Sequence, residues 1–147
     1  MKILSKKEKI EITKKLDEEF GIKKIQGTIL QHGKGKLRIF SGNLNKDLLL
    51  ILKKNFVIEN IGLYFAKEEK DEIRLTFDGV QIFKDQISKN ILEISDEEKS
   101  RWLKGEELYK KNEKGWKILK NRDDFFGCGK STGEKIANFV PKGRRIK

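Results

Sequence analysis

The chain has 147 residues, of which 36% are hydrophobic and 39% charged, and its net charge is +11 at pH 7. Aliphatic residues recur in every segment, which excludes a disordered chain, and the length fits one domain or two small ones. One cysteine and one histidine exclude an internal disulfide and a zinc site built from these ligands, and no apolar run is long enough for a membrane span.

A helix is predicted close to the amino terminus. Ser5 and Glu8 have the spacing of a capping box, in which each side chain accepts a hydrogen bond from the other residue's backbone N–H. Gly21 is a typical residue to end this helix. Between these signals the apolar residues follow four-residue spacing on one face: Ile12, Leu16 and Phe20.

A hairpin and a second helix are expected next. Residues 25–31 and 36–41 are strand-like runs, and the connection between them contains two glycines, as hairpin loops often do. Asn45 can cap a helix through residues 48–52, a run of leucine and isoleucine. We expect the leucines of this helix to lie in the core.

Three short strands follow at residues 56–58, 63–67 and 72–77. The charged segment between the last two turns the chain, and it is the predicted boundary between two domains. The first domain, residues 1–70, is expected to be a small α/β unit. The second, residues 71–147, is expected to be mainly β, so that the fold class is α+β.

The second domain contains further helix and strand signals. Asp78 can begin a short helix that carries Val80, Phe83 and Ile87, and residues 91–94 are apolar enough for a buried strand. Ser95 and Glu98 form a second capping box, before a helix that Gly105 ends. Gly, Asn and Asp turn signals separate three strand-sized runs, at residues 115–120, 124–130 and 134–140.

The excess positive charge is concentrated at the carboxyl end. Residues 1–36 carry a net charge of +5 and residues 37–109 a net charge of −2, whereas residues 110–147 carry +8. A concentrated positive field attracts polyanions, and nucleic acid is the leading class of partner. The alternative is a charged surface of the kind found in heat-adapted organisms. The uneven distribution favours a binding surface.

The segment around Gly129-Lys130-Ser131 imitates the end of a phosphate-binding loop, but the spacing is wrong. Such a loop needs a glycine where this chain has Asp124, and no long helical pattern follows. Gly127 and Gly129 indicate instead a close approach to another backbone or to a phosphate, with a β-bulge as the alternative. Cys128 has no histidine near it in sequence and is expected to be a small buried residue.

Aromatic and basic residues of the carboxyl-terminal half could contact RNA. Trp102 and Trp116 could stack on unpaired bases, although a core position is favoured for Trp116 and is left open for Trp102. In the tail, Arg144 and Arg145 could clamp phosphates, because guanidinium groups donate in a planar fork. The alternative is a frayed basic tail, against which the apolar residues of this segment argue.

Three motifs, in order, resemble a known module. They are Arg101-Trp-Leu-Lys-Gly-Glu106, Gly127-Cys-Gly-Lys130 and Asn138-Phe-Val-Pro-Lys-Gly-Arg144. Together they resemble the PUA-like RNA-binding module of the Sun/Fmu group of RNA cytosine-C5 methyltransferases, over roughly residues 73–147. The whole chain resembles small stand-alone archaeal relatives of that group that act in ribosome biogenesis. The resemblance implies a β-barrel-like module that binds rRNA or tRNA.

The resemblance does not extend to catalysis. The enzymes of this group have a glycine-rich cofactor loop and a nucleophilic cysteine after proline, but the only proline here is Pro141, and Cys128 follows a glycine. We therefore expect a cytoplasmic, non-catalytic RNA-binding protein without cofactor or metal, which acts in rRNA processing or tRNA modification. The alternative is a subunit that docks onto an RNA methyltransferase or a ribosomal protein. The predicted RNA-binding residues are Arg101, Lys104, Lys130, Lys135, Asn138, Lys142, Arg144 and Arg145.

Overall fold

A computed structural model of the chain describes residues 1–42, 44–55 and 61–147, without the side chains of residues 53 and 55. Within these residues it contains four α-helices and two five-stranded sheets, so the predicted α+β class is confirmed. The strand expected at residues 56–58 lies outside the described residues. Among the helices described, none combines the length and apolar character needed to cross a membrane.

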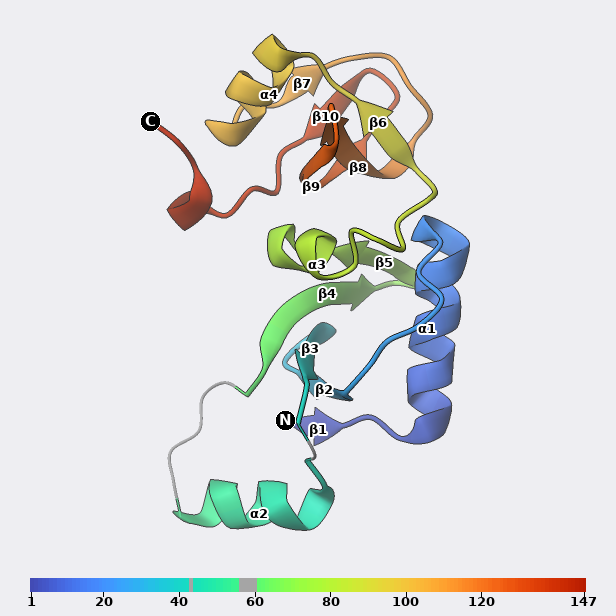
Figure 1. The fold of residues 1–147 in the computed structure, drawn as a ribbon, viewed down its shortest axis with the longest axis vertical. Helices are drawn as coiled ribbons and strands as arrows, with labels where there is room; N and C mark the ends of the chain where they lie inside the picture. The colour runs from blue at the N-terminus through green and yellow to red at the C-terminus, as the bar shows by residue number, and fades with distance from the viewer. Residues whose placement is uncertain (43, 56–60) are drawn as a thin grey trace.

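The first sheet is antiparallel, with its strands side by side in chain order. It consists of β1 (Lys2–Ile3), β2 (Thr28–His32), β3 (Lys36–Phe40), β4 (Leu63–Glu69) and β5 (Glu72–Leu75). Helix α1 (Lys6–Phe20) runs along one side of it (Figure 1). The predicted capping box of Ser5 and Glu8 begins α1, and Gly21 ends it in the left-handed conformation with φ +81°.

The second sheet has the strand order β6-β8-β9-β10-β7, with β6 parallel to β8 and the other pairs antiparallel. Ser95 and Glu98 cap α4 (Asp96–Leu103) as predicted, and the 3-10 helix η1 (Lys142–Arg144) lies in the tail. The strands are β6 (Ile91–Glu93), β7 (Leu108–Tyr109), β8 (Gly115–Asn121), β9 (Asp124–Ser131) and β10 (Lys135–Ala137). The last strand is shorter than the expected 134–140.

Helix α3 (Phe77–Ile82) lies between the two sheets (Figure 1). Its N-cap is Thr76, whose hydroxyl oxygen accepts a hydrogen bond from Gly79 N–H at 2.9 Å, so the helix begins one residue before the predicted Asp78. Val80 is buried in α3, and Phe83 and Ile87 are buried beyond its end. The helix therefore closes the core of the first sheet on the side that faces the second.

The principal core is shared by the two sheets. Side chains of α1 and the first sheet pack in one cluster with Trp116, Ile118 and Cys128 of the second sheet. The predicted boundary between residues 70 and 71 lies at the tip of the hairpin formed by β4 and β5, and β5 completes the first sheet. The division into domains at this position stays a prediction. The shared core gives the sheets a continuous packed contact.

The prediction that the leucines of α2 (Lys46–Asn55) are core residues is wrong for two of the four. Leu49 is buried, but Leu48 is 39% exposed and Leu50 is 64% exposed. The helix lies at the end of the molecule remote from the second sheet (Figure 1) and contributes to only a small cluster around Leu30. One face of α2 is therefore covered, and its other apolar residues face solvent.

Candidate functional site

The carboxyl-terminal tail is held against the second sheet. Ile146 N–H donates to the Leu103 carbonyl at 2.9 Å, and Arg145 Nε donates to the Val140 carbonyl at 3.1 Å. Arg145 lies over Gly105, where a Cβ atom would come within 2.6 Å of its Nε. The tail is thus ordered, as its apolar residues predict.

Two of the predicted cations in this region already form ion pairs. Arg144 donates to Asp78 of α3 at 2.8 Å, and Lys135 lies 3.1 Å from the carboxylate of Glu107. The Glu107 carboxylate raises the pKa of Lys135. Both pairs are exposed, and exposed ion pairs contribute little to stability. A phosphate group could therefore replace either carboxylate at small cost.

Other predicted cations have no such partner. Lys104, at the end of α4, and Lys142, in η1, are exposed and form no ion pair with the part of the chain that the structure describes. Arg101 is also exposed, in the last turn of α4. Because the tail lies beside the end of α4 (Figure 1), these residues belong to one region, here called the tail cluster. It consists of Arg101, Lys104, Lys142, Arg144 and Arg145.

Asn138, one of the predicted RNA-binding residues, has a structural role. Its Nδ2 donates to the carbonyl oxygens of Trp102 and Glu106, both at 2.8 Å, and its Oδ1 accepts from Val140 N–H at 2.8 Å. Both amide hydrogens and the amide oxygen are used within the domain. The side chain therefore ties the tail to the end of α4.

The glycine motif in β9 is explained by packing. A Cβ atom on Gly129 would come within 2.6 Å of both Ile136 Cγ2 and Trp102 Cη2. Gly127, with φ +87°, adopts the left-handed conformation beside the Phe77 ring. Gly129 and Lys130 belong to a strand, which agrees with the rejection of a phosphate-binding loop. Both interpretations are met: the register between β8 and β9 shifts at Gly127, as in a β-bulge, and the close approach at Gly129 is to side chains and a backbone of the same chain.

Cys128 is buried, as expected, and burial raises the pKa of its thiol to about 12. At neutral pH the thiol is therefore protonated, and a protonated thiol is a poor nucleophile. Trp102 is also fully buried, and its Nε1–H donates to the Phe126 carbonyl at 2.6 Å. The position left open for Trp102 is thus a core position.

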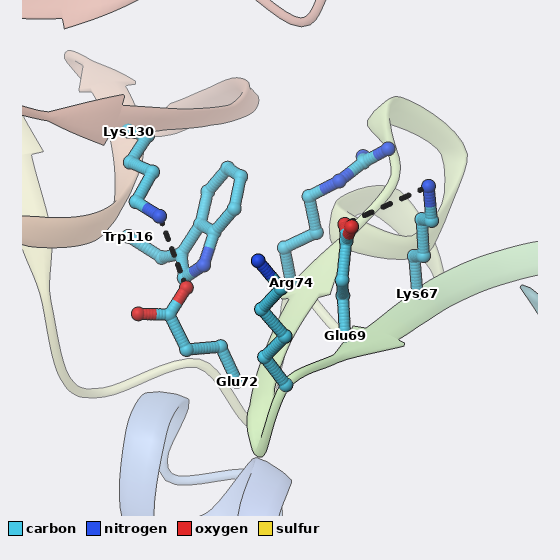
Figure 2. Close-up of a pocket in the computed structure, with 7 residues that line it drawn as sticks. Lys67, Glu69, Glu72, Arg74, Trp116 and Lys130 are labelled. Carbon is cyan, nitrogen blue, oxygen red and sulfur yellow. Dashed lines mark hydrogen bonds and ion pairs between the residues drawn. The ribbon is translucent and has the colours of Figure 1, made fainter. Parts of the chain in front are cut away.

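Lys130 takes part in a different arrangement, a pocket between the two sheets (Figure 2). Its Nζ lies 3.0 Å from the carboxylate of Glu72, which belongs to β5 of the first sheet. The pocket has a volume of about 350 Å³ and is called the junction pocket here. It is lined by Lys67, Glu69, Lys70, Glu72, Arg74, Trp116 and Lys130.

Local structure explains how these residues meet. In β5 the side chains alternate, so that Ile73 is buried in the core while Glu72 and Arg74 face the pocket. At the tip of the hairpin, Lys70 and Asp71 have φ values of +49° and +67°. Positive φ at both central residues is the signature of a tight two-residue turn, and it places Lys70 at the rim.

From the other sheet, Trp116 of β8 and Lys130 of β9 are direct cross-strand neighbours. The Lys130 Nζ lies 5.3 Å from the centre of the Trp116 ring. On the opposite wall the Arg74 guanidinium lies 5.7 Å from the same ring and 4.9 Å from the ring of Phe139. Trp116 and Phe139 pack edge to face, with ring centres 5.1 Å apart. The aromatic pair thus holds two cations at the pocket.

The hydrogen bond from Lys130 is the main reason why the pKa of Glu72 is lowered. The indole N–H of Trp116 faces the same carboxylate and also lowers its pKa, but the two do not reach hydrogen-bonding geometry. Trp116 is only 9% exposed, and its N–H has no partner among the described residues. A buried donor without a partner costs about 1–3 kcal/mol.

Sequence reasoning missed Lys67, Lys70 and Arg74. All three lie before the three motifs and the basic carboxyl-terminal segment from which the site was predicted. The alternation of charged and apolar residues in β5 was a usable signal, since it predicts that Arg74 faces away from the core. It does not say what Arg74 faces. For Trp116 the expected core position is confirmed, and the pocket adds a second role for its N–H.

Comparison with known proteins identifies the part of the chain that forms the second sheet. Residues 89–146 match the family model of the methyltransferase RsmF PUA domain, so this unit is a PUA-like domain of the Sun/Fmu methyltransferase group. The matched segment contains α4, the second sheet and almost all of the tail, and residues 1–88 lie outside it. No curated protein matches the chain. The predicted family resemblance of the carboxyl-terminal half is confirmed.

Proposed function

We propose that this protein binds structured RNA through its PUA domain and performs no chemistry of its own. The observation that carries the proposal is the family match over residues 89–146, because PUA domains are associated with RNA binding. The concentration of positive charge in the same segment supports it. The proposed role is in rRNA or tRNA maturation or ribosome biogenesis, in the cytoplasm of an archaeal cell.

The tail cluster is the proposed contact with the RNA backbone. Arg144 can exchange Asp78 for a phosphate, and Lys104 and Lys142 offer cations that no carboxylate of the described residues neutralises. Contacts of this kind read the shape of a folded RNA more than its sequence. The absence of a catalytic step in the proposal is supported by Cys128, whose buried thiol has a pKa of about 12.

Changing Lys104 and Lys142 together to glutamate is expected to weaken binding to a structured RNA by about tenfold or more. The loss of each phosphate contact should also reduce the slope of log affinity against log salt concentration, by about one for each lysine. Fluorescence anisotropy at several salt concentrations measures both quantities. Neither side chain forms an ion pair with residues 1–42, 44–55 or 61–147, so stability should change little.

The matched control is the double change of Lys6 and Lys7 to glutamate. These exposed lysines begin α1, at the end of the helix remote from the second sheet (Figure 1), and acidic residues suit the first turn of a helix. The net charge changes equally in both variants. Equal losses of affinity would point to an unspecific field, and a loss only in the control would move the RNA site to the amino-terminal half.

A second candidate function is supported by the exposed face of α2. Leu48 and Leu50 are both exposed, and a patch of exposed leucines is typical of a protein-binding surface. In this alternative the chain docks onto an RNA methyltransferase or a pre-ribosomal protein. A complex that survives nuclease treatment, and is lost when both leucines are changed to glutamate, would favour this function over direct RNA binding.

A further inference from the structure

The junction pocket holds hydrogen-bond donors that nothing in the described chain uses. The Trp116 indole N–H is buried and has no hydrogen-bond partner among the residues that the structure describes. The Arg74 guanidinium is half-buried, and its contacts in the described chain are with the rings of Trp116 and Phe139, without a hydrogen bond. A guanidinium group has five N–H donors, and structures rarely leave buried donors unused. Within the described part of the chain, neither donor group therefore has an acceptor in hydrogen-bonding geometry.

The charge of the pocket indicates an anionic ligand. Four of its residues are basic and two are acidic, and the arginine and lysine side chains only donate hydrogen bonds. An indole N–H is likewise only a donor. A phosphate group is only an acceptor and carries negative charge, so it satisfies all of these groups at once.

The Glu72 carboxylate occupies the position in which an oxygen atom of such an anion would be stabilised. Its carboxylate accepts the hydrogen bond of Lys130 at 3.0 Å and lies beside the indole N–H of Trp116 (Figure 2). Glu72 is an exposed residue, so its side chain can leave the pocket without uncovering the core. In the free protein it occupies a position that a stronger anion could take.

We propose that the junction pocket binds a phosphate group of an unpaired nucleotide of RNA, with Trp116, Arg74 and Lys130 as donors and Glu72 as the group that the phosphate displaces. The inference rests on the proposed function and extends it to the first sheet. The volume of about 350 Å³ lies at the small end of ligand pockets and suits one nucleotide. A double helix is too broad to bring a phosphate to an indole N–H that is almost fully buried.

The two tryptophans provide the experiment. Trp102 donates its indole N–H to Phe126 inside the core, whereas the N–H of Trp116 has no partner in the described ranges of the chain. Their indole signals in a ¹H–¹⁵N spectrum therefore report different sites. Titration with uridine monophosphate, and with a short unpaired oligoribonucleotide, should shift the Trp116 signal saturably and leave the Trp102 signal unchanged. The variant Trp116→Phe assigns the signals.

Additional titrations define the ligand. Sodium chloride at equal ionic strength tests for a general salt effect, and oligoribonucleotides with a terminal phosphate or a terminal hydroxyl separate a terminal phosphate from an internal one. A shift with both oligoribonucleotides assigns the site to an internal phosphate, and a shift with the phosphorylated one alone assigns it to the chain end. A shift of both indole signals with chloride alone would overturn the proposal.

Substitutions test the individual donors. Arg74→Gln and Lys70→Gln, at the wall and rim of the pocket, should weaken the oligoribonucleotide complex, by about tenfold for Arg74. Because Arg74 packs on aromatic rings, Lys70 serves as the variant that leaves the core untouched. Glu72→Gln should strengthen binding, and Glu69→Gln, whose carboxylate lies 3.8 Å from Lys67, is the matched control.

The outcomes separate this inference from the proposed function. If the wild-type protein binds no RNA, the proposed function fails as well. If it binds RNA with a silent Trp116 signal and unchanged affinity in the Arg74 and Lys70 variants, only the junction pocket is excluded. If Glu72→Gln weakens binding, the carboxylate contacts the ligand and is not displaced by it.

Discussion

Gly129→Ala is expected to lower the free energy of unfolding by about 3 kcal/mol. The added Cβ would lie 2.6 Å from Ile136 Cγ2 and 2.6 Å from Trp102 Cη2. Both neighbours are fully buried, so neither can move aside without disturbing the core of the PUA domain. The Ala137 carbonyl oxygen, only 2.9 Å from the same position, blocks a shift toward β10. Urea denaturation measured by tryptophan fluorescence gives the change.

Gly143→Ala is the matched control, because a Cβ atom there meets nothing within 4 Å. Its stability should stay within about 0.5 kcal/mol of the wild type, as for most surface substitutions. The comparison also decides why the Gly-Cys-Gly-Lys motif contains glycine. If Gly129→Ala folded as stably as the wild type but lost RNA affinity, close approach of a phosphate would be the reason and packing would not.

The parts of the fold that the sequence predicts are those governed by neighbouring residues. Both capping boxes form as their spacing indicates, and Gly21 ends α1 with the positive φ that glycine adopts easily. Strands β8 and β9 coincide with the strand-sized runs that turn residues bound. Each of these signals is complete within a few residues, so no knowledge of distant contacts is needed.

Features that depend on distant contacts were not predicted. Strands β1 and β7 have two residues each, too few to carry a pattern, and pairing with β2 and β10 creates them. The helix α2 has a strongly apolar run, yet only a few residues of a neighbouring cluster are available to cover it. Periodicity says that a helix has an apolar face, but it does not say how much of that face is covered.

The candidate site shows the same division. The basic tail and its arginines can be recognised from the sequence, since charge density needs no structure. The junction pocket cannot be, because Arg74 and Trp116 lie in different sheets and 42 positions apart in the sequence. Nor does the sequence show that Arg144 pairs with Asp78, 66 positions earlier, and Lys130 with Glu72, 58 positions earlier.

Asn138→Ala is expected to destabilise the protein by about 2–3 kcal/mol and to leave the affinity of the folded protein for RNA nearly unchanged. The side chain makes three hydrogen bonds, each with a net contribution of about 1 kcal/mol. Its loss frees the carbonyls of Trp102 and Glu106 and the N–H of Val140. The end of α4 and the start of the tail then lose their common anchor.

Two measurements on this variant separate a structural role from RNA contact. Urea denaturation gives the stability, and anisotropy well below the unfolding temperature gives the affinity of the folded form. Hydrogen exchange at Ile146, whose N–H donates to Leu103 at 2.9 Å, should quicken as the tail loosens. A loss of RNA affinity of tenfold or more without a change in stability would return Asn138 to the RNA-binding surface that its motif indicated. The Asn138 amide satisfies three backbone groups at once. In the sequence alone, an asparagine with this structural role looks the same as an asparagine that binds RNA.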